Sequence, residues 1–291
     1  MNTYQSEYGV LKSVLLKHVK DAFRSQDYID RHWQDLNYLS RPDFSRAMEE
    51  YEQFVQIFID HNIEVDFLPF EESTGIDSIY VRDASIITNK GAIICNMGKA
   101  QRITEPKEEM SYYLRSGIAI AGSYLNPATI EGGDVAWIND KLMAVAEGYR
   151  TNAEGIALLK DLTAETCNEV LVMDSPHYKG PSDVFHLMSV LSPVDHNLAV
   201  VYSPLMTVPF RNRLIDLGIS FVEVPDNEFE SLGCNVLALA PRLCLMVEGN
   251  PVTKQRLEES GVEVIEFKGD EICLKGSGGP TCLTRPLLRE T

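Results

Sequence analysis

Apolar residues along this chain recur in a pattern that predicts alternating strands and helices. Short apolar runs with a β-rich composition, typical of strands, occupy residues 11–17, 64–68 and 262–267. Apolar positions with helical spacing occupy residues 42–61, 153–162, 209–217 and 251–260. The chain is therefore predicted to have an α/β fold.

One unit repeats along most of the chain: two apolar strands joined by a tight turn, usually followed by a helix and a closing strand. The turns fall at residues 89–91, 139–141, 195–197 and 241–242, and the first strands of the first and third of these units are expected to begin at about Ser78 and at His186. A polar residue stands at the entrance of each unit, and these residues lie 51, 52, 49 and 47 positions apart: Asp83, Asp134, His186, Asn235 and Cys282. A period near fifty residues is typical of a propeller-like array, and the N-terminal segment brings the number of units to five.

In such an array the strands converge on an axis, so residues fifty positions apart are expected to gather in one central site. No low-complexity or Pro/Ser-rich linker divides the chain, and we therefore predict a single catalytic domain over residues 1–291.

Composition narrows the classes of function. The net charge is −17, from 26 basic and 43 acidic residues, which argues against nucleic acid as a partner and is compatible with a cationic substrate. No apolar run reaches the length of about 18 residues that a membrane span requires, and the N-terminus lacks the pattern of a signal peptide. We expect a cytoplasmic protein without a membrane partner.

The six cysteines include one candidate nucleophile. Because no CxxC or CxxH pair occurs, neither a zinc site nor a disulfide framework is expected. Cys95, Cys234, Cys244 and Cys273 lie within or beside apolar runs, as buried cysteines do. Cys282 instead lies in the glycine-rich stretch GSGGPTCLTRP, where a thiol can face a cleft, although a structural cysteine in a turn would fit the same local sequence.

Other titratable residues share its register or its polar context. His186 begins the apolar stretch FHLMSVLSP, which fits either a core histidine or a partner for the thiol. Glu131 lies in EGGD, and Asp77 and Asp83 lie in GIDSIYVRDASIIT. Buried carboxylates there would need a cation, and a guanidinium matches them well, but an exposed turn is the alternative.

Two arginines complete the set of candidates. Arg102 in KAQRITE and Arg150 in GYRTNAEG have the geometry to clamp a carboxylate with two hydrogen bonds, although surface positions are the default for arginine.

Together, the motifs VRDA, EGGDV, RTNAEG, FHLMS, GCNVLALAP and GGPTCL resemble, in order and spacing, those of the guanidino-group-modifying superfamily. Its members include dimethylarginine dimethylaminohydrolases, arginine deiminases and amidinotransferases. The resemblance extends from about residue 9 to 286 and implies the pentein fold, a five-bladed α/β propeller of ββαβ units around a central active site.

The resemblance also implies roles for the candidate residues. Cys282 matches the catalytic nucleophile and His186 the general acid/base, while Glu131 and Asp83 match carboxylates that hold the guanidinium. Asp77 matches a further acidic position of the site. Arg102 and Arg150 match arginines that bind the substrate α-carboxylate, and neither a metal nor an organic cofactor is implied.

The branch of the superfamily is less sharply indicated. Deiminases and amidinotransferases usually carry an aspartate two positions after the histidine, where this chain has Met188, and this difference favours an alkylated guanidinium. Arg82 before Asp83, and the long helical segment over residues 18–60, fit the dimethylaminohydrolases less well.

The expected function is hydrolysis of dimethylarginine or monomethylarginine to citrulline and an alkylamine through a covalent thiouronium intermediate on the cysteine. The alternatives are an arginine deiminase, an amidinotransferase and a catalytically inactive propeller scaffold. The expected partner is a small arginine-like molecule, and a homodimer is left open.

Overall fold

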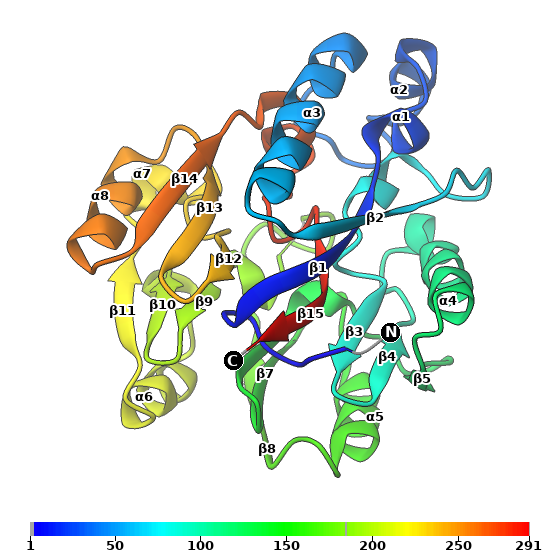
Figure 1. The fold of residues 1–291 in the computed structure, drawn as a ribbon. Helices are drawn as coiled ribbons and strands as arrows, with labels where there is room; N and C mark the ends of the chain where they lie inside the picture. The colour runs from blue at the N-terminus through cyan, green and yellow to red at the C-terminus, as the bar shows by residue number, and fades with distance from the viewer. Residues whose placement is uncertain (1–2, 184, 291) are drawn as a thin grey trace.

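The computed structural model describes residues 3–183 and 185–290, so the extreme ends of the predicted 1–291 domain lie outside the described residues. Within them, the strands form five three-stranded sheets. Figure 1 shows these sheets set around the middle of the molecule, with helices α3, α4, α5, α6 and α8 on the periphery. The α/β propeller predicted from the sequence is confirmed.

Four of the sheets repeat one connection. The first two strands form an antiparallel hairpin, and a helical excursion then returns the chain so that the third strand runs parallel to the second. The sheets are β3 (Ser85–Thr88), β4 (Gly91–Ile94) and β5 (Ile120–Ser123); β6 (Val135–Asn139), β7 (Leu142–Glu147) and β8 (Glu169–Asp174); β9 (Leu191–Asp195), β10 (Leu198–Val201) and β11 (Ser220–Glu223); and β12 (Leu237–Ala240), β13 (Leu243–Val247) and β14 (Glu263–Phe267). The helices in these connections are α4 (Glu105–Arg115), α5 (Ala153–Thr163), α6 (Val208–Asp216) and α8 (Pro251–Glu259).

The fifth sheet is built from both ends of the chain. Strand β15 (Arg285–Glu290) pairs antiparallel with β1 (Val10–Lys17), and β1 runs parallel to β2 (Glu64–Leu68) after helix α3 (Phe44–Asp60). The N-terminal segment therefore supplies only two strands of its unit. As Figure 1 shows, this pairing brings the two ends of the chain to the same region of the molecule.

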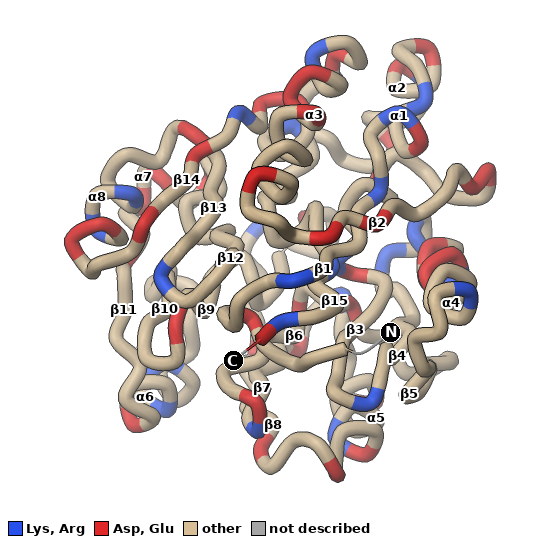
Figure 2. Tube along the Cα trace, in the orientation of Figure 1, with Lys and Arg blue, Asp and Glu red and all other residues tan. Residues whose placement is uncertain are grey.

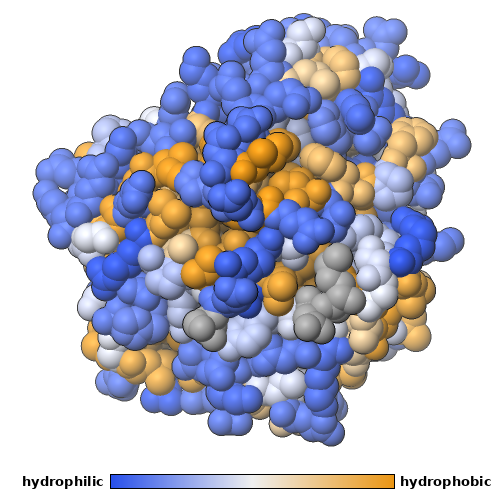
Figure 3. Space-filling model, in the orientation of Figure 1, coloured by the Kyte–Doolittle hydropathy of each residue, from blue (hydrophilic) through white to orange (hydrophobic). Residues whose placement is uncertain are grey.

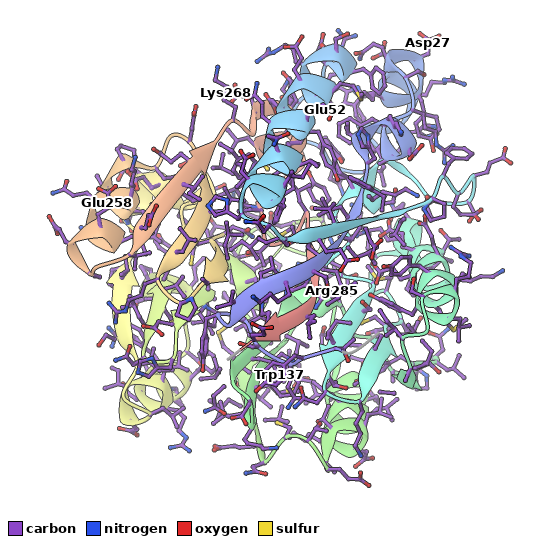
Figure 4. All side chains as sticks on the ribbon, in the orientation of Figure 1. Asp27, Glu52, Trp137, Glu258, Lys268 and Arg285 are labelled. Atoms are coloured by element: carbon purple, nitrogen blue, oxygen red, sulfur yellow. The ribbon has the colours of Figure 1, made fainter. Side chains whose placement is uncertain are left out.

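Hydrophobic packing holds the units together. In α3, Tyr51, Phe54 and Phe58 are buried, and Phe54 packs against Phe267 of β14 with ring centroids 4.9 Å apart. Trp137 of β6, labelled in Figure 4, donates from Nε1 to the carbonyl of Ile87 in β3 at 3.0 Å and so joins neighbouring sheets. Burial of such aromatic side chains contributes strongly to the stability of a core.

The face of the molecule drawn in Figure 3 is largely hydrophilic, with apolar residues in patches between hydrophilic ones. Figure 2 shows acidic residues on the outer helices α3, α4 and α8. None of the described helices is long and apolar enough to cross a membrane.

One buried acid lies away from the surface charges. Glu109 of α4 accepts a hydrogen bond from the Tyr113 hydroxyl at 3.1 Å. Burial raises the pKa of Glu109 to about 8, although Ser85, Arg285 and Tyr113 act in the opposite direction. Arg285, labelled on β15 in Figure 4, is also buried.

Two predicted strand starts are wrong. The strand expected from about Ser78 begins only at Ser85, after a 3-10 turn over Ile76–Ile79. His186 does not begin a strand either, because the 3-10 turn Leu187–Ser189 follows it and β9 starts at Leu191. At His186 the backbone bonds to side chains instead of a sheet neighbour: the Ser189 hydroxyl accepts from the His186 N–H at 3.1 Å.

Helices also precede α3 and β5. The segment before α3 forms two short helices, α1 (Val19–Ala22) and α2 (Gln26–His32), as its helical character predicted. Helix α4 was not among the predicted helices; its apolar pattern is weakened by several buried acids, including Glu105, Glu108 and Glu109.

Candidate active site

The five polar residues of the repeat register lie just before the first strand of their sheets. Asp83 and Asp134 precede β3 and β6, His186 and Asn235 precede β9 and β12, and Cys282 precedes β15. They meet in space. The His186 Nδ1 atom lies 3.8 Å from Asp83 Oδ1, and the Asn235 amide donates to Cys282 Sγ at 3.3 Å. The fifty-residue spacing thus gathers side chains from five units in one place.

Cys282 is the most accessible cysteine of the described chain: its side chain is partly exposed, whereas the other five are buried. Burial around the sulfur raises the pKa of Cys282 to about 11, and the negative charge of Asp83 adds to the effect. The Asn235 hydrogen bond and the backbone at Gly279 act in the opposite direction. Without a bound cation, Cys282 therefore carries its proton at neutral pH.

His186 is surrounded by acids. Its Nε2 atom lies 2.8 Å from Glu131 Oε2, and Asp134 accepts the N–H of the next residue, Leu187, at 3.2 Å. Burial alone would lower the pKa of His186, but Asp83, Asp134 and Glu131 together raise it above its ordinary value. The same pairing lowers the pKa of Glu131, despite burial, with help from Arg150 and Arg102. His186 and Glu131 therefore form a buried imidazolium–carboxylate pair.

Asp134 differs from the other acids of the site. Burial raises its pKa to about 6, because the charge of His186 and a 2.7 Å hydrogen bond from Thr151 offset only part of the desolvation cost. Its position behind the Leu187 N–H suits it to fixing the turn that presents His186.

Glycines allow close contacts between the parts of the site. A Cβ atom on Gly133 would lie 2.6 Å from both Asp83 Oδ1 and His186 Nδ1, so any other residue would push the two side chains aside. The glycines before Cys282 also allow close packing within the protein: a Cβ on Gly279 would lie 2.5 Å from Asn235 Oδ1, and one on Gly276 or Gly278 would collide with the Tyr80 side chain.

Two further candidates, Asp77 and Arg150, lie in the same site, and each forms an ion pair with a residue of opposite charge. The Lys99 ammonium lies 2.6 Å from Asp77 Oδ2, and the Lys99 backbone N–H donates to Glu131 Oε1 at 2.9 Å. The Arg150 guanidinium reaches Glu131 more loosely, at 3.4 Å. Lys99 was not among the residues selected from the sequence, because a single lysine beside a glycine gives no local signal of a site.

Arg102 is held mainly by protein groups. Its Nη1 atom donates to Asp83 Oδ2 at 2.5 Å, its Nε and Nη2 atoms donate to Glu105, and Nη2 also donates to the Tyr80 carbonyl at 2.8 Å. A bidentate grip on a substrate carboxylate would require Arg102 to release one of these contacts. The predicted role of Arg102 in substrate binding stays a prediction.

Two cavities open beside Cys282 and His186. The smaller, of about 20 Å³, is polar and is lined by Asp77, Tyr80, Asp83, Lys99, Arg102, Arg150, His186, Cys282 and the backbone of 276–278. The larger, of about 120 Å³, is lined by five apolar residues, Leu39, Phe185, Met188, Phe229 and Leu232, together with charged residues that include Lys179, Asp183 and Glu230. It is called the apolar cavity for its five apolar residues. The thiol therefore adjoins one small polar cavity and one larger cavity with apolar side chains in its lining.

Among the described residues, Asp83, Glu131 and His186 could present ligand atoms to a metal, since one atom from each lies within 4.8 Å of the others. Two of these ligand atoms already bond one another, His186 Nε2 with Glu131 Oε2. Each carboxylate oxygen of Asp83 and Glu131 already has a hydrogen-bond partner in the protein, and only Asp83 of the two lines the small polar cavity.

Comparison with known proteins identifies the family and the fold. The family model of N,N-dimethylarginine dimethylhydrolase, eukaryotic, matches residues 22–289. An uncharacterized protein of Bacillus subtilis, YkgA, is 27% identical over 98% of this chain and 94% of its own length. An arginine deiminase of Rhodococcus jostii is 30% identical over 56% of this chain, which spans only 47% of that enzyme.

A solved structure shares the fold. The dimethylarginine dimethylaminohydrolase of Pseudomonas aeruginosa, a cysteine-to-serine variant in complex with citrulline, superposes with a TM-score of 0.76 at 22% identity, covering 94% of this chain and 98% of that one. The five-sheet propeller and the match of the family model over most of the sequence lead to one assignment. This chain belongs to the N,N-dimethylarginine dimethylhydrolase family, within the pentein superfamily of guanidino-group-modifying enzymes.

Proposed function

We propose that this protein hydrolyses an N-alkylated, arginine-like guanidine, such as dimethylarginine or monomethylarginine, to citrulline and an alkylamine. The observation that carries the proposal is the Cys282 thiol beside a buried His186–Glu131 pair, between a charged cavity and an apolar one. This arrangement provides a nucleophile, a proton donor and carboxylates for a cation in one place.

Binding of a guanidinium supports activation of the thiol. Burial and Asp83 hold the pKa of Cys282 at about 11. A substrate cation lying between Asp83 and the sulfur would offset the carboxylate charge and favour the thiolate. Activation would then occur when substrate is present, and the free thiol would be less open to side reactions.

The chemistry follows in two stages. The Cys282 thiol gives its proton to solvent when the substrate cation binds. The thiolate then adds to the guanidinium carbon, and the carbon–nitrogen bond to the alkylamine breaks as His186 gives its proton to the leaving nitrogen. A thiouronium remains on the sulfur. Water then attacks the same carbon, passing one proton to the neutral His186, and the carbon–sulfur bond breaks to release the thiolate and the urea group of citrulline, whose remaining hydroxyl proton passes to solvent.

Glu131 keeps His186 protonated for the first stage of the reaction. Its carboxylate lies 2.8 Å from His186 Nε2 and raises the pKa of the imidazole, so His186 is charged when the leaving group needs a proton. Asp83 and Glu131 also match the guanidinium and hold its positive charge near the sulfur.

The apolar cavity supports an alkylated substrate. Met188 is buried and lines this cavity with Phe185, Phe229 and Leu232. An unsubstituted guanidinium nitrogen placed directly against these four side chains would meet no acceptor on them, whereas methyl groups would be buried favourably there. Arg82, whose presence fits the deiminases better, is ion-paired with Glu7 at 3.1 Å and lines neither of the two cavities.

One assay tests the proposal. Purified protein is incubated with dimethylarginine, monomethylarginine and arginine, with and without glycine as an amine acceptor, and the products are separated. Citrulline with methylamines supports the proposal. Ammonia from arginine alone would indicate a deiminase, a new guanidino product only with glycine would indicate an amidinotransferase, and no product would favour an inactive scaffold.

A further inference from the structure

A lysine of the protein is paired with one of the two acids that line the small polar cavity beside Cys282. The Lys99 Nζ atom lies 2.6 Å from Asp77 Oδ2 and 2.9 Å from the Leu36 carbonyl. Both charged side chains are buried, and both line the small polar cavity beside Cys282. The carboxylate of Asp77 therefore already has a cationic partner from the protein.

The position of Lys99 is fixed from two sides. Its backbone N–H donates to Glu131 Oε1 at 2.9 Å, so its main chain helps to hold the carboxylate that bonds His186. The side chain then runs to Asp77 and to a carbonyl of the N-terminal segment. With these contacts the ammonium cannot swing away to solvent without leaving Asp77 buried and unpaired, which is costly.

The charges around this cavity favour an anionic end of the substrate over a cationic one. Lys99, Arg102 and Arg150 line it together with Asp77 and Asp83. A substrate ammonium drawn to Asp77 would face the Lys99 ammonium across the same carboxylate, and like charges a few ångströms apart repel strongly where water is excluded. A substrate carboxylate would instead meet Arg150 and the ammonium of Lys99.

We propose that Lys99 is a specificity-determining residue that takes the place of a substrate α-ammonium at Asp77. The site then accepts ω-guanidino carboxylates without an α-amino group at least as well as the corresponding arginine derivatives. This inference rests on the proposed function, because it concerns the far end of the same guanidine substrate.

The test compares substrates that differ in one group. The kcat/KM of the wild-type protein is measured for dimethylarginine, for its analogue without the α-amino group (a dimethylated 5-guanidinopentanoate), and for dimethylated agmatine, which lacks the carboxylate. We expect the des-amino compound to match or exceed dimethylarginine, and dimethylated agmatine to be the poorest of the three.

Variants of Lys99 separate charge from packing. Lys99→Met keeps much of the side-chain length but frees Asp77, so the ratio of kcat/KM for dimethylarginine over the des-amino analogue should rise about tenfold or more, equivalent to about 1.4 kcal/mol. Lys99→Arg keeps the positive charge and should keep the wild-type preference. Thermal unfolding of each variant shows whether it is folded.

A wild-type preference for dimethylarginine of more than about tenfold, or a Lys99→Met ratio unchanged from wild type, would overturn the role of Lys99. If Lys99→Met fails to fold, the wild-type and Lys99→Arg ratios decide the question. If no compound is turned over, binding to Cys282→Ser is measured by calorimetry. Binding in the expected order would then overturn only the hydrolytic function, and no binding would overturn both proposals.

Discussion

Replacing Glu131 by glutamine should lower the pKa of His186 by about one unit, which corresponds to about 1.4 kcal/mol. The imidazole is buried, which opposes its charge, and its raised pKa is shared among Asp83, Asp134 and Glu131. Glu131 is at hydrogen-bond distance, 2.8 Å, whereas Asp83 is 3.8 Å away. The glutamine amide retains the size of the carboxylate but not its charge, so the electrostatic part of the effect is isolated.

The assay is an NMR titration of the His186 imidazole, together with the pH dependence of kcat/KM. If His186 donates the proton to the leaving group, loss of its proton limits the rate at alkaline pH, and that limb should move to lower pH with the NMR midpoint. Glu52→Gln is a matched control. Glu52, which lies on helix α3 and is labelled in Figure 4, is paired with another histidine, His18. Loss of its carboxylate should leave the His186 titration unchanged. An identical His186 midpoint in Glu131→Gln and wild type would refute the reasoning.

Further changes test other parts of the site and the core. Cys282→Ser should reduce turnover at least about a thousandfold without changing the melting temperature much, and persisting turnover would exclude Cys282 as the nucleophile. Asn235→Ala removes a hydrogen bond that lowers the Cys282 pKa, so the alkylation rate of the thiol at fixed pH should fall; an unchanged or faster rate would contradict this. Met188→Asp buries a carboxylate at the apolar wall and should lower kcat/KM for dimethylarginine about tenfold relative to arginine, and equal losses for both would remove the argument for an alkyl subsite. Because the pKa of Glu109 is raised to about 8 in the folded protein, the protonated acid stabilises the fold, and free energy of unfolding is lost as the pH rises from about 4.5 toward 8. In urea unfolding, Glu109→Gln should weaken this pH dependence by up to about 1.4 kcal/mol per pH unit. Parallel curves of unfolding free energy against pH for the variant and the wild type would contradict the prediction.

The sequence was sufficient to predict the repeated unit and the residues that converge on the axis. The hairpins and the helices α3, α5, α6 and α8 are specified locally, by turn residues and by the spacing of apolar positions, whereas α4, with its buried acids, is not. Equivalent positions in the repeat therefore lie close together in space. Asp83, His186 and Cys282 each precede the first strand of a different sheet, and all three line the same small cavity.

Contacts that depend on the direction of individual side chains could not be predicted from the repeat. Lys99 pairs with Asp77 across a turn and two strands, and nothing in the local sequence of either residue indicates the other. Arg102 is an intermediate case. Its partner Glu105 lies three residues later, a spacing at which helical side chains meet, so the sequence contained a signal that Arg102 is held by the protein.

The predicted strand starts at Ser78 and His186 were wrong because the local sequence did give a signal, and the chain does not follow it there. Apolar β-rich residues there favour extended structure, but polar groups capture the backbone first. The Asp77 carbonyl closes a turn onto the N–H of Tyr80, and the Asp134 carboxylate holds the N–H after His186. At His186, a carboxylate of the site thus holds the chain away from the extended structure that its local sequence favours.

The sheet formed by β15, β1 and β2 has a consequence for how the enzyme is made. Strand β1 is synthesised early, but one of its two neighbours in the sheet, β15, is the last of the described strands to be synthesised. Cys282 lies three residues before β15 and arrives almost with it. Cys282 therefore follows the other candidate site residues in the order of synthesis, and partly synthesised chains that end before it would carry the carboxylates and the histidine without this thiol.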